Sequence, residues 1–373
     1  MSPKARRTRK PFRLALLTGG GDCPGLNAVI RAAARSAFAL GWEVYGIEDG
    51  FEGLLTRRAH QLHPRDVRGI LHLGGTILGT SNRVNPFRVD RRARPGNKAN
   101  DADRSAEVVR NFKAMGFGAL IAIGGDGTLS IALRLAAKGI PVVGVPKTID
   151  NDIEHTSVTF GFDTAVSTAT DAIDKLHPTT EAHGRVMVVE LMGRNAGFIA
   201  LNSGVAGGAD VILIPEIPFD LDLVCDKIRE REKGHRGGYF SIVVVAEGAR
   251  SKGGKIHLRA TDQGGAPRLG GIGAWVAEEI GKRTGKETRS LVLGHLQRGG
   301  PPTTFDRLLG TRFGAAAVRA VKDGAFQTMV ALKPPTIVRV PLKDAVGEGR
   351  TKKVPLDSDV VLSARGLGVS FGD

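Results

Sequence analysis

The sequence predicts an α/β protein of two Rossmann-like, doubly wound domains with mainly parallel central sheets. Three observations support this. Short apolar runs alternate with stretches of helical periodicity. The 51 glycines fall at the ends of apolar runs and show no collagen-like period. The 373 residues, 41% of them hydrophobic, suffice for two hydrophobic cores.

The first half of the chain repeats the order strand, glycine-rich turn, helix. We expect buried strands at 12–17, 43–47, 119–123 and 141–145, and helices at 26–40 and 129–138. A second series follows, with strands at 186–191, 211–214 and 241–246 and a helix at 221–232. Alternation of this kind places ligands at the carboxyl ends of the strands.

Composition excludes several classes of protein. The net charge of +15 includes six basic residues before the first acidic one, and aromatic residues are only 5%, so a single-strand nucleic-acid binder is not indicated. The sequence has neither an apolar stretch of ~18 residues nor a signal-peptide pattern, which favours a cytoplasmic protein without membrane contact. Its two cysteines lack metal-ligand spacing.

Two glycine-rich turns could bind phosphate. Gly19-Gly20-Gly21-Asp22 precedes a helix, but the spacing is neither the dinucleotide fingerprint nor a Walker A loop, and an ordinary turn remains open. Gly124-Gly125-Asp126-Gly127-Thr128 is more specific. It offers backbone N–H groups to a phosphate and, in Asp126, a carboxylate able to hold Mg²⁺ beside polyphosphate oxygens.

Thr148-Ile149-Asp150-Asn151-Asp152 follows the next expected strand, so two carboxylates two residues apart would face one reaction centre. Phosphoryl transfer needs positioning, charge neutralisation and a carboxylate that accepts the proton of the acceptor hydroxyl. Asp150 is the candidate for this base. The alternative is a solvated acidic turn.

Several basic residues lie at strand ends or in glycine-rich turns. Guanidinium groups bind phosphate through paired hydrogen bonds, so their convergence would indicate an acceptor that is already phosphorylated. Taken singly, each is more often a structural or surface residue than a ligand of phosphate. The candidates are Arg185, Arg194, Arg289, Arg298 and the nearby His295.

Together these segments resemble the 6-phosphofructokinases, the glycolytic enzymes that phosphorylate fructose 6-phosphate at O1. The resemblance runs from Leu14 to about Val321. It rests on TGGGDCPGLNAVIR, GGTILGTSNR, GGDGT, PKTIDND, VVELMGRNAGF, the acidic residue of VVVAEG, and TRSLVLGHLQRGG, in that order. Lipid and NAD kinases share the Gly-Gly-Asp-Gly-Thr segment but lack this combination.

The resemblance implies a role for each matching residue. Asp150 would be the catalytic base and Asp126 the Mg²⁺ ligand. The phosphates of ATP would contact Gly21, Arg83, Gly125, Asp126, Gly127 and Thr128. Fructose 6-phosphate would contact Thr148, Asp150, Met192, Gly193, Arg194, Glu247, His295 and Arg298, together with Arg185 and Arg289 from a neighbouring subunit. A homodimer or homotetramer with shared active sites is therefore implied.

The resemblance also suggests a domain division and leaves one alternative open. We expect a basic tail (1–11), a larger donor domain (12–161 with about 297–335), a smaller sugar-phosphate domain (162–296) and a C-terminal extension of unassigned role (336–373). Diphosphate-dependent relatives carry lysine at the position of Lys147, but aspartate at that of Gly127. Because Gly127 leaves room for the α-phosphate of a nucleotide, ATP is favoured and diphosphate remains the alternative donor.

Overall fold

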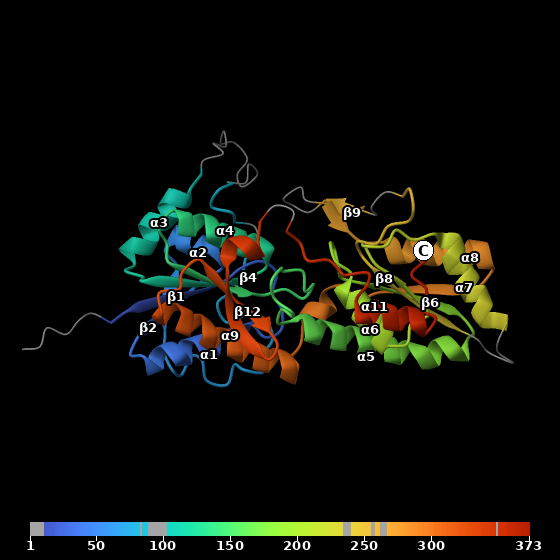
Figure 1. The fold of residues 1–373 in the computed structure, drawn as a ribbon, viewed down its shortest axis with the longest axis horizontal. Helices are drawn as coiled ribbons and strands as arrows, with labels where there is room; N and C mark the ends of the chain where they lie inside the picture. Colours follow the sequence, from blue (N-terminus) through green and yellow to red (C-terminus); the bar gives the residue numbers. More distant parts are fainter. Residues whose placement is uncertain are drawn as a thin grey trace, which may run out of the picture. The chain divides into compact units, whose positions relative to one another are not determined.

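A computed structural model describes residues 11–82, 84–88, 103–233, 240–254, 258–261, 267–347 and 350–373. The chain forms two compact units. The first ends at Pro146 and resumes over Arg307–Gly347, and the second comprises Lys147–Asp306 and the chain from residue 348 onward. Figure 1 shows both units. The assignment of donor and acceptor to separate domains stays a prediction.

The first unit is built on a seven-stranded sheet in the order β13-β12-β5-β4-β1-β2-β3. The strands from β12 to β2 run parallel, and β13 and β3 pair antiparallel at the two edges. Strands β4 and β5 are buried throughout, as expected for central strands covered on both faces. The bounds are Arg13–Thr18 (β1), Glu43–Ile47 (β2), Ala59–Leu62 (β3), Ala119–Gly124 (β4), Val142–Pro146 (β5), Thr328–Lys333 (β12) and Thr336–Pro341 (β13).

Helices cover both faces of this sheet. Helices α1 and α9 lie on one face and α4 on the other (Figure 1). Helices α1 and α9 approach closely at Gly314, where an added Cβ would stand 2.4 Å from the carbonyl oxygen of Val29. The bounds are Leu26–Ala39 (α1), Phe51–Thr56 (α2), Ser105–Ala114 (α3), Asp126–Ala137 (α4), Thr304–Lys322 (α9) and Leu342–Ala345 (α10).

The second unit is built on a four-stranded parallel sheet in the order β11-β6-β8-β7, beside a separate hairpin of β9 and β10. The strand bounds are Val186–Leu191 (β6), Val211–Leu213 (β7), Ser241–Ala246 (β8), Leu258–Thr261 (β9), Pro267–Leu269 (β10) and Thr288–Val292 (β11). The helix bounds are Phe162–Ala182 (α5), Phe198–Ala206 (α6), Leu221–Lys233 (α7), Ile272–Thr284 (α8) and Asp359–Gly366 (α11), with a 3₁₀ helix, η1, at Gly294–Arg298.

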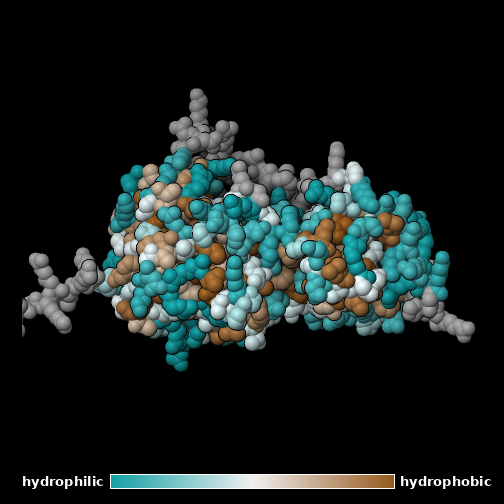
Figure 2. Space-filling view, viewed as in Figure 1, coloured by the Kyte–Doolittle hydropathy of each residue, from teal (hydrophilic) through white to brown (hydrophobic). Residues whose placement is uncertain are grey.

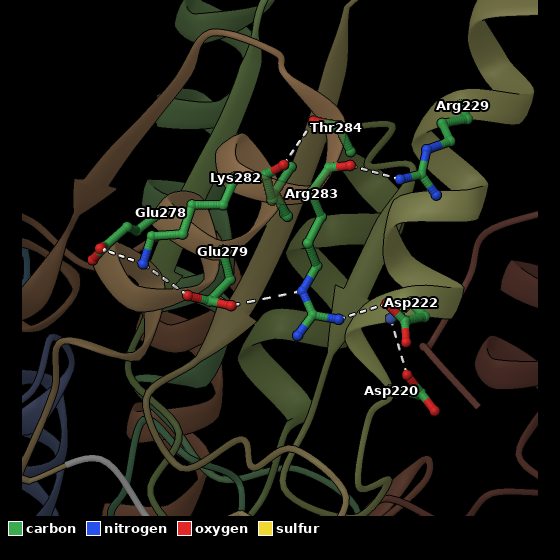
Figure 3. Close-up of polar contacts among 9 residues, drawn as sticks. Asp220, Asp222, Arg229, Glu278, Glu279, Lys282, Arg283 and Thr284 are labelled. Carbon is green, nitrogen blue, oxygen red and sulfur yellow. Dashed lines mark hydrogen bonds and ion pairs between the residues drawn. The ribbon is translucent and has the colours of Figure 1, made fainter.

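Helices α7 and α8 cover one face of the second sheet, and α5, α6 and α11 cover the other (Figure 1). Valine side chains of β6, β7 and β8, together with Leu213 of β7, form a buried core with α7 and α8. At the surface, Arg283 of α8 pairs with Asp222 of α7 at 2.5 Å, and Arg229 donates to the Arg283 carbonyl at 2.7 Å (Figure 3). These exposed contacts add little stability compared with the core.

The predicted fold class is confirmed, and most element bounds agree. Strands β2, β6 and β8 have the expected bounds. Helix α4 differs because it begins at Asp126 rather than at residue 129. Gly125 is extended, so the turn is complete before Asp126, and an acidic residue in the first turn suits the helix dipole.

The outer surface gives no sign of a membrane-spanning segment in the described part of the chain, where no helix is long and apolar enough to cross a bilayer. On the face drawn in Figure 2, hydrophobic residues lie in small groups between hydrophilic ones. Two leucines are exposed here, Leu362 of α11 and Leu367 directly after it. Scattered exposed leucines of this kind are normal for a folded domain.

We expect Gly314→Ala to lower the midpoint of thermal unfolding, because the added methyl group must displace the α1 backbone at Val29. Overpacking of this kind costs about 1–3 kcal/mol. The matched control is Gly366→Ala at the exposed end of α11, where an added Cβ meets no atom within 4 Å. Alanine should leave stability there unchanged or slightly raised. Equal midpoints for the two variants would contradict the described packing of α1 and α9.

Candidate active site

The candidate donor site lies at the carboxyl edge of the first sheet, where β1 and β4 are neighbours. The chain proceeds from β1 to β2 on one side and later returns to β4 on the other, so the direction of winding changes between these strands. Open parallel sheets bind ligands at such switch points. The turns after the two strands meet here, because the Gly19 N–H donates to the Ile123 carbonyl at 3.0 Å.

Glycine is required at two positions of this edge. A Cβ at Gly19 would stand 2.7 Å from Oγ1 of Thr128, and one at Gly124 would stand 2.3 Å from the Thr128 Cβ. The Thr128 side chain is therefore buried between the two turns. Its backbone N–H belongs to the first turn of α4, where N–H groups have no partner within the helix and are suited to an anion.

Asp126 and Gly127 open helix α4 and are exposed, and Gly125 caps it. No cluster of three potential metal-binding side chains occurs among the described residues. Mg²⁺ beside a polyphosphate commonly uses one or two carboxylates and completes its shell with phosphate oxygens and water. The single exposed carboxylate of Asp126 fits that requirement. Gly21 lies in the turn before α1, and Arg83 lies outside the described residues.

The candidate acceptor loop, residues 147–152, directly follows β5 and is counted with the second unit. Thr159 holds the loop at two points. Its hydroxyl donates to the Thr148 carbonyl at 2.8 Å, and its N–H donates to Oδ1 of Asn151 at 3.1 Å. Asn151 adopts a φ of 54°, which asparagine tolerates better than most residues. Asp150 and Asp152 are the residues directly before and after Asn151 in this turn.

Asp150 is held in an environment that disfavours its charge. Its Oδ1 is enclosed by protein and makes no hydrogen bond among the described residues. Burial raises the pKa of Asp150 to about 7, and the Asp152 and Glu247 carboxylates act in the same direction. The charges of Arg298 and Lys147 oppose this shift. A carboxylate of this pKa is partly ionised at neutral pH and is a stronger base than an ordinary aspartate.

Asp152 shares this environment. Burial raises its pKa as well, while a hydrogen bond from Thr148 and the charges of Lys147 and Lys353 lower it. Lys147 itself is only 3% exposed. The positive charge of its ammonium group lowers the pKa of both carboxylates of the loop, Asp150 and Asp152.

The turns after β6 and β8 lie side by side at the carboxyl edge of the second sheet. Gly248 donates its N–H to the Gly193 carbonyl at 3.1 Å, and a Cβ at Gly248 would stand 2.1 Å from the Arg194 carbonyl oxygen. Met192 is half-buried and Arg194 exposed. Glu247 follows β8; burial and the neighbouring Glu190 raise its pKa, against a hydrogen bond from the Gly193 N–H.

The short helix η1 follows β11 and carries His295 and Arg298. Arg298 lies close enough to act electrostatically on both Asp150 and Glu247. His295 is exposed on the same helix. The structure thus brings together the loop after β5, the turns after β6 and β8, and the helix after β11, as expected for a site at the carboxyl edge.

Arg185 and Arg289 are not part of this group. Arg185 precedes the amino end of β6, and Arg289 is the second residue of β11, so both lie toward the opposite edge of the sheet. A strand of six residues spans about 20 Å. The two arginines share a counter-ion, Glu287, at 3.7 Å from Arg185 and 2.9 Å from Arg289.

Sequence reasoning missed two residues beside the acceptor loop, Lys352 and Lys353 of the C-terminal extension. The Lys352 N–H donates to the Asp152 carbonyl at 3.0 Å, and the Lys353 charge acts on the Asp152 carboxylate. Two adjacent lysines in a polar stretch carry no signal of their own, so only the folded chain reveals this placement.

We expect Asp150→Asn to raise the thermal unfolding midpoint, and the gain to grow between about pH 4 and 7. The folded pKa of about 7 exceeds the unfolded value of 3.8, so the native carboxyl resists an ionisation that the unfolded chain undergoes freely. Stability contributed by the protonated form is thus lost across that interval, and asparagine avoids the loss. The exposed Asp357→Asn is the control. A gain independent of pH would contradict the description of Asp150.

The phosphofructokinase family model matches residues 13–321. The ATP-dependent 6-phosphofructokinase of Chloroflexus aurantiacus is 54% identical, over 98% of this chain and 99% of the relative. The pyrophosphate–fructose 6-phosphate 1-phosphotransferase of Amycolatopsis mediterranei is 52% identical, over 92% of this chain and 97% of the relative.

The fold is also similar to that of a phosphofructokinase of known structure. Pichia pastoris phosphofructokinase in the T-state superposes with a TM-score of 0.76 at 33% identity, over 92% of this chain. The chain spans only 36% of the length of that yeast chain. The family model, the curated relatives and the shared fold lead to one conclusion: the chain belongs to the phosphofructokinase family.

Proposed function

We propose that this chain is an ATP-dependent 6-phosphofructokinase, which converts ATP and fructose 6-phosphate into ADP and fructose 1,6-bisphosphate. The observation that carries the proposal is the enclosed Oδ1 of Asp150, a basic carboxylate oxygen that forms no hydrogen bond among the described residues. Such an oxygen suits a substrate hydroxyl that must lose its proton. The 54% identity to an ATP-dependent 6-phosphofructokinase supports the same reaction.

The acceptor would bind at the carboxyl edge of the second sheet. Arginines there can hold its phosphate through paired hydrogen bonds, and Glu247 can accept hydrogen bonds from sugar hydroxyls. Orienting the sugar in this way directs one hydroxyl, on C1, at Asp150. The proposed contacts are Thr148, Met192, Gly193, Arg194, Glu247, His295 and Arg298.

In the proposed step, Asp150 accepts the proton of the O1 hydroxyl while O1 forms a bond to the γ-phosphorus. The bond from that phosphorus to the bridging oxygen breaks, and ADP leaves with the electron pair. The N–H groups at the start of α4 would hold the donor phosphates. Mg²⁺ held by Asp126 would neutralise charge on those phosphates.

The second candidate function is a diphosphate-dependent phosphofructokinase, which differs from the first in its phosphoryl donor. An added Cβ at Gly127 meets no atom within 4 Å, so the position is open to a nucleotide. Lys147 and the 52% identity to a pyrophosphate-dependent relative favour diphosphate instead. However, Lys147 is buried and acts on Asp150 and Asp152, a role that either donor would allow. We therefore propose ATP as the donor.

The deciding experiment assays the purified protein with fructose 6-phosphate and Mg²⁺, with ATP or diphosphate as sole donor. We expect turnover with ATP. Gly127→Asp should lower kcat/KM for ATP by at least about tenfold through repulsion of the nucleotide phosphates. Gly127→Asn is the matched neutral control and should lose much less. Turnover of the unchanged chain with diphosphate alone would refute the proposal.

We propose that Arg185 and Arg289 serve the acceptor site of a neighbouring subunit in a homodimer or homotetramer. Their position toward the amino edge of the sheet keeps them from the acceptor residues of their own chain. Nε of Arg185 is enclosed and makes no hydrogen bond among the described residues. A donor group held in this way is suited to an anion delivered by another subunit.

Mixed oligomers test this arrangement. Alone, Asp150→Asn should lose at least about 100-fold in kcat, and Arg185→Ala should chiefly raise KM for fructose 6-phosphate. Mixing the two after subunit exchange should restore part of the activity, because one kind of mixed site has both residues intact. Asp150→Asn mixed with Glu247→Ala is the control, and no recovery is expected because both residues lie at one edge. Absence of recovery in both mixtures, despite demonstrated exchange, would exclude shared sites.

A further inference from the structure

The C-terminal strap, residues 350–354, runs past the acceptor loop within the second unit. Lys352 anchors it. Its N–H donates to the Asp152 carbonyl at 3.0 Å, and its ammonium group donates to the carbonyls of Thr156 and Ser157 at 3.1 and 2.8 Å. These bonds attach the strap to the backbone on the far side of Asp152.

The next two residues attach the strap to other segments. Lys353 donates from its ammonium group to the carbonyl of Asn195, in the turn after β6. Val354 donates its N–H to Glu216 at 2.9 Å, and the same carboxylate accepts the N–H of Gly197 at 3.1 Å. The strap therefore joins the acceptor loop to the turn that carries Met192, Gly193 and Arg194.

Lys353 differs from Lys352 in a way that matters for charge. The Lys352 ammonium is largely buried against carbonyl groups, and burial lowers its pKa. The Lys353 side chain is exposed, yet its charge still acts on the Asp152 carboxylate. An exposed lysine that makes no specific contact would extend into water and keep its rotamer freedom. This side chain is instead directed at two segments of the acceptor site.

We propose that Lys353 is a positioning residue of the acceptor site, which joins the acceptor loop to the turn after β6 and keeps a positive charge beside the Asp152 carboxylate. The proposal rests on the proposed function for the identity of the acceptor. Lys353 would act through Asp152 and Asn195 and would not itself take part in the transfer. It assigns a role to part of the extension beyond residue 335.

The charges around the loop set the expected direction of the effect. Asp152 is faced by Asp150 and by the ammonium groups of Lys147, Lys352 and Lys353, with a hydrogen bond from Thr148. Removing the Lys353 charge raises the pKa of Asp152. Since Asp150 and Asp152 titrate as a coupled pair, the ionisation required for catalysis then moves to higher pH.

The test compares Lys353→Met and Lys353→Arg with Lys343→Met, an exposed lysine of α10 in the first unit. Steady-state rates with fructose 6-phosphate are measured from about pH 6 to 9, and thermal unfolding at about pH 5 and 8. For Lys353→Met we expect kcat/KM for fructose 6-phosphate to fall on the order of tenfold. We also expect the acid limb of the plot of rate against pH to move to higher pH by about half a unit. Lys353→Arg should restore both, and Lys343→Met should change neither.

The two readouts separate this proposal from the proposed function. Unchanged kinetics in Lys353→Met, or lower activity with an unmoved acid limb, would overturn the positioning role. If the unchanged chain transfers phosphate from neither donor, the proposed function fails. The thermal unfolding measurements then still test the positioning role of Lys353. Loss of Lys353 should then depress the midpoint more at pH 8 than at pH 5, because a higher native pKa makes ionisation costlier. A parallel shift at both pH values would overturn the proposal.

Discussion

Burial of the Asp150 carboxylate is the constraint on which the candidate acceptor site depends. An ionised carboxylate out of water is costly unless charges and hydrogen bonds compensate it. Here two further acidic groups, Asp152 and Glu247, add repulsion, and basic groups from three separate segments offset it. Arg298 comes from η1, Lys147 from the loop itself and Lys353 from the C-terminal strap. The two well-packed sheets make such a local cost tolerable, since catalytic groups commonly occupy destabilised positions.

At the carboxyl edge of the first sheet, the candidate donor site, the main constraint is the space between the two turns. Thr128 fits between Gly19 and Gly124 only because neither has a side chain, and this brings the two turns together. The first turn of α4 is left exposed with a single carboxylate, Asp126. Backbone donors suit any phosphate, so a preference between donors at this edge would depend on positions such as Gly127, where the lack of a side chain leaves open space. The acceptor edge instead depends on side-chain charge.

The fold could be predicted from sequence because its signals are local. Apolar runs followed within three residues by a glycine marked β2, β6 and β8, and the segments carrying Asp150, Glu247 and Arg298 followed from strand ends. Local pattern does not report contacts between distant segments. Nothing near residue 353 indicates that it lies beside Asp152, a neighbour some 200 positions away along the chain. The predicted start of α4 was wrong for a related reason. The helix begins after the extended backbone of Gly125, and side-chain periodicity does not show this.

The shared counter-ion of Arg185 and Arg289 has a consequence for how much enzyme is needed to see activity. If both arginines complete a neighbour's site, a dissociated chain keeps its base but lacks part of the grip on the sugar's phosphate. Specific activity would then fall on dilution by mass action, and sugar phosphate would favour association because it binds across the subunit boundary. In the separated chain, Glu287 would keep the two guanidinium groups paired and close together until a partner arrives.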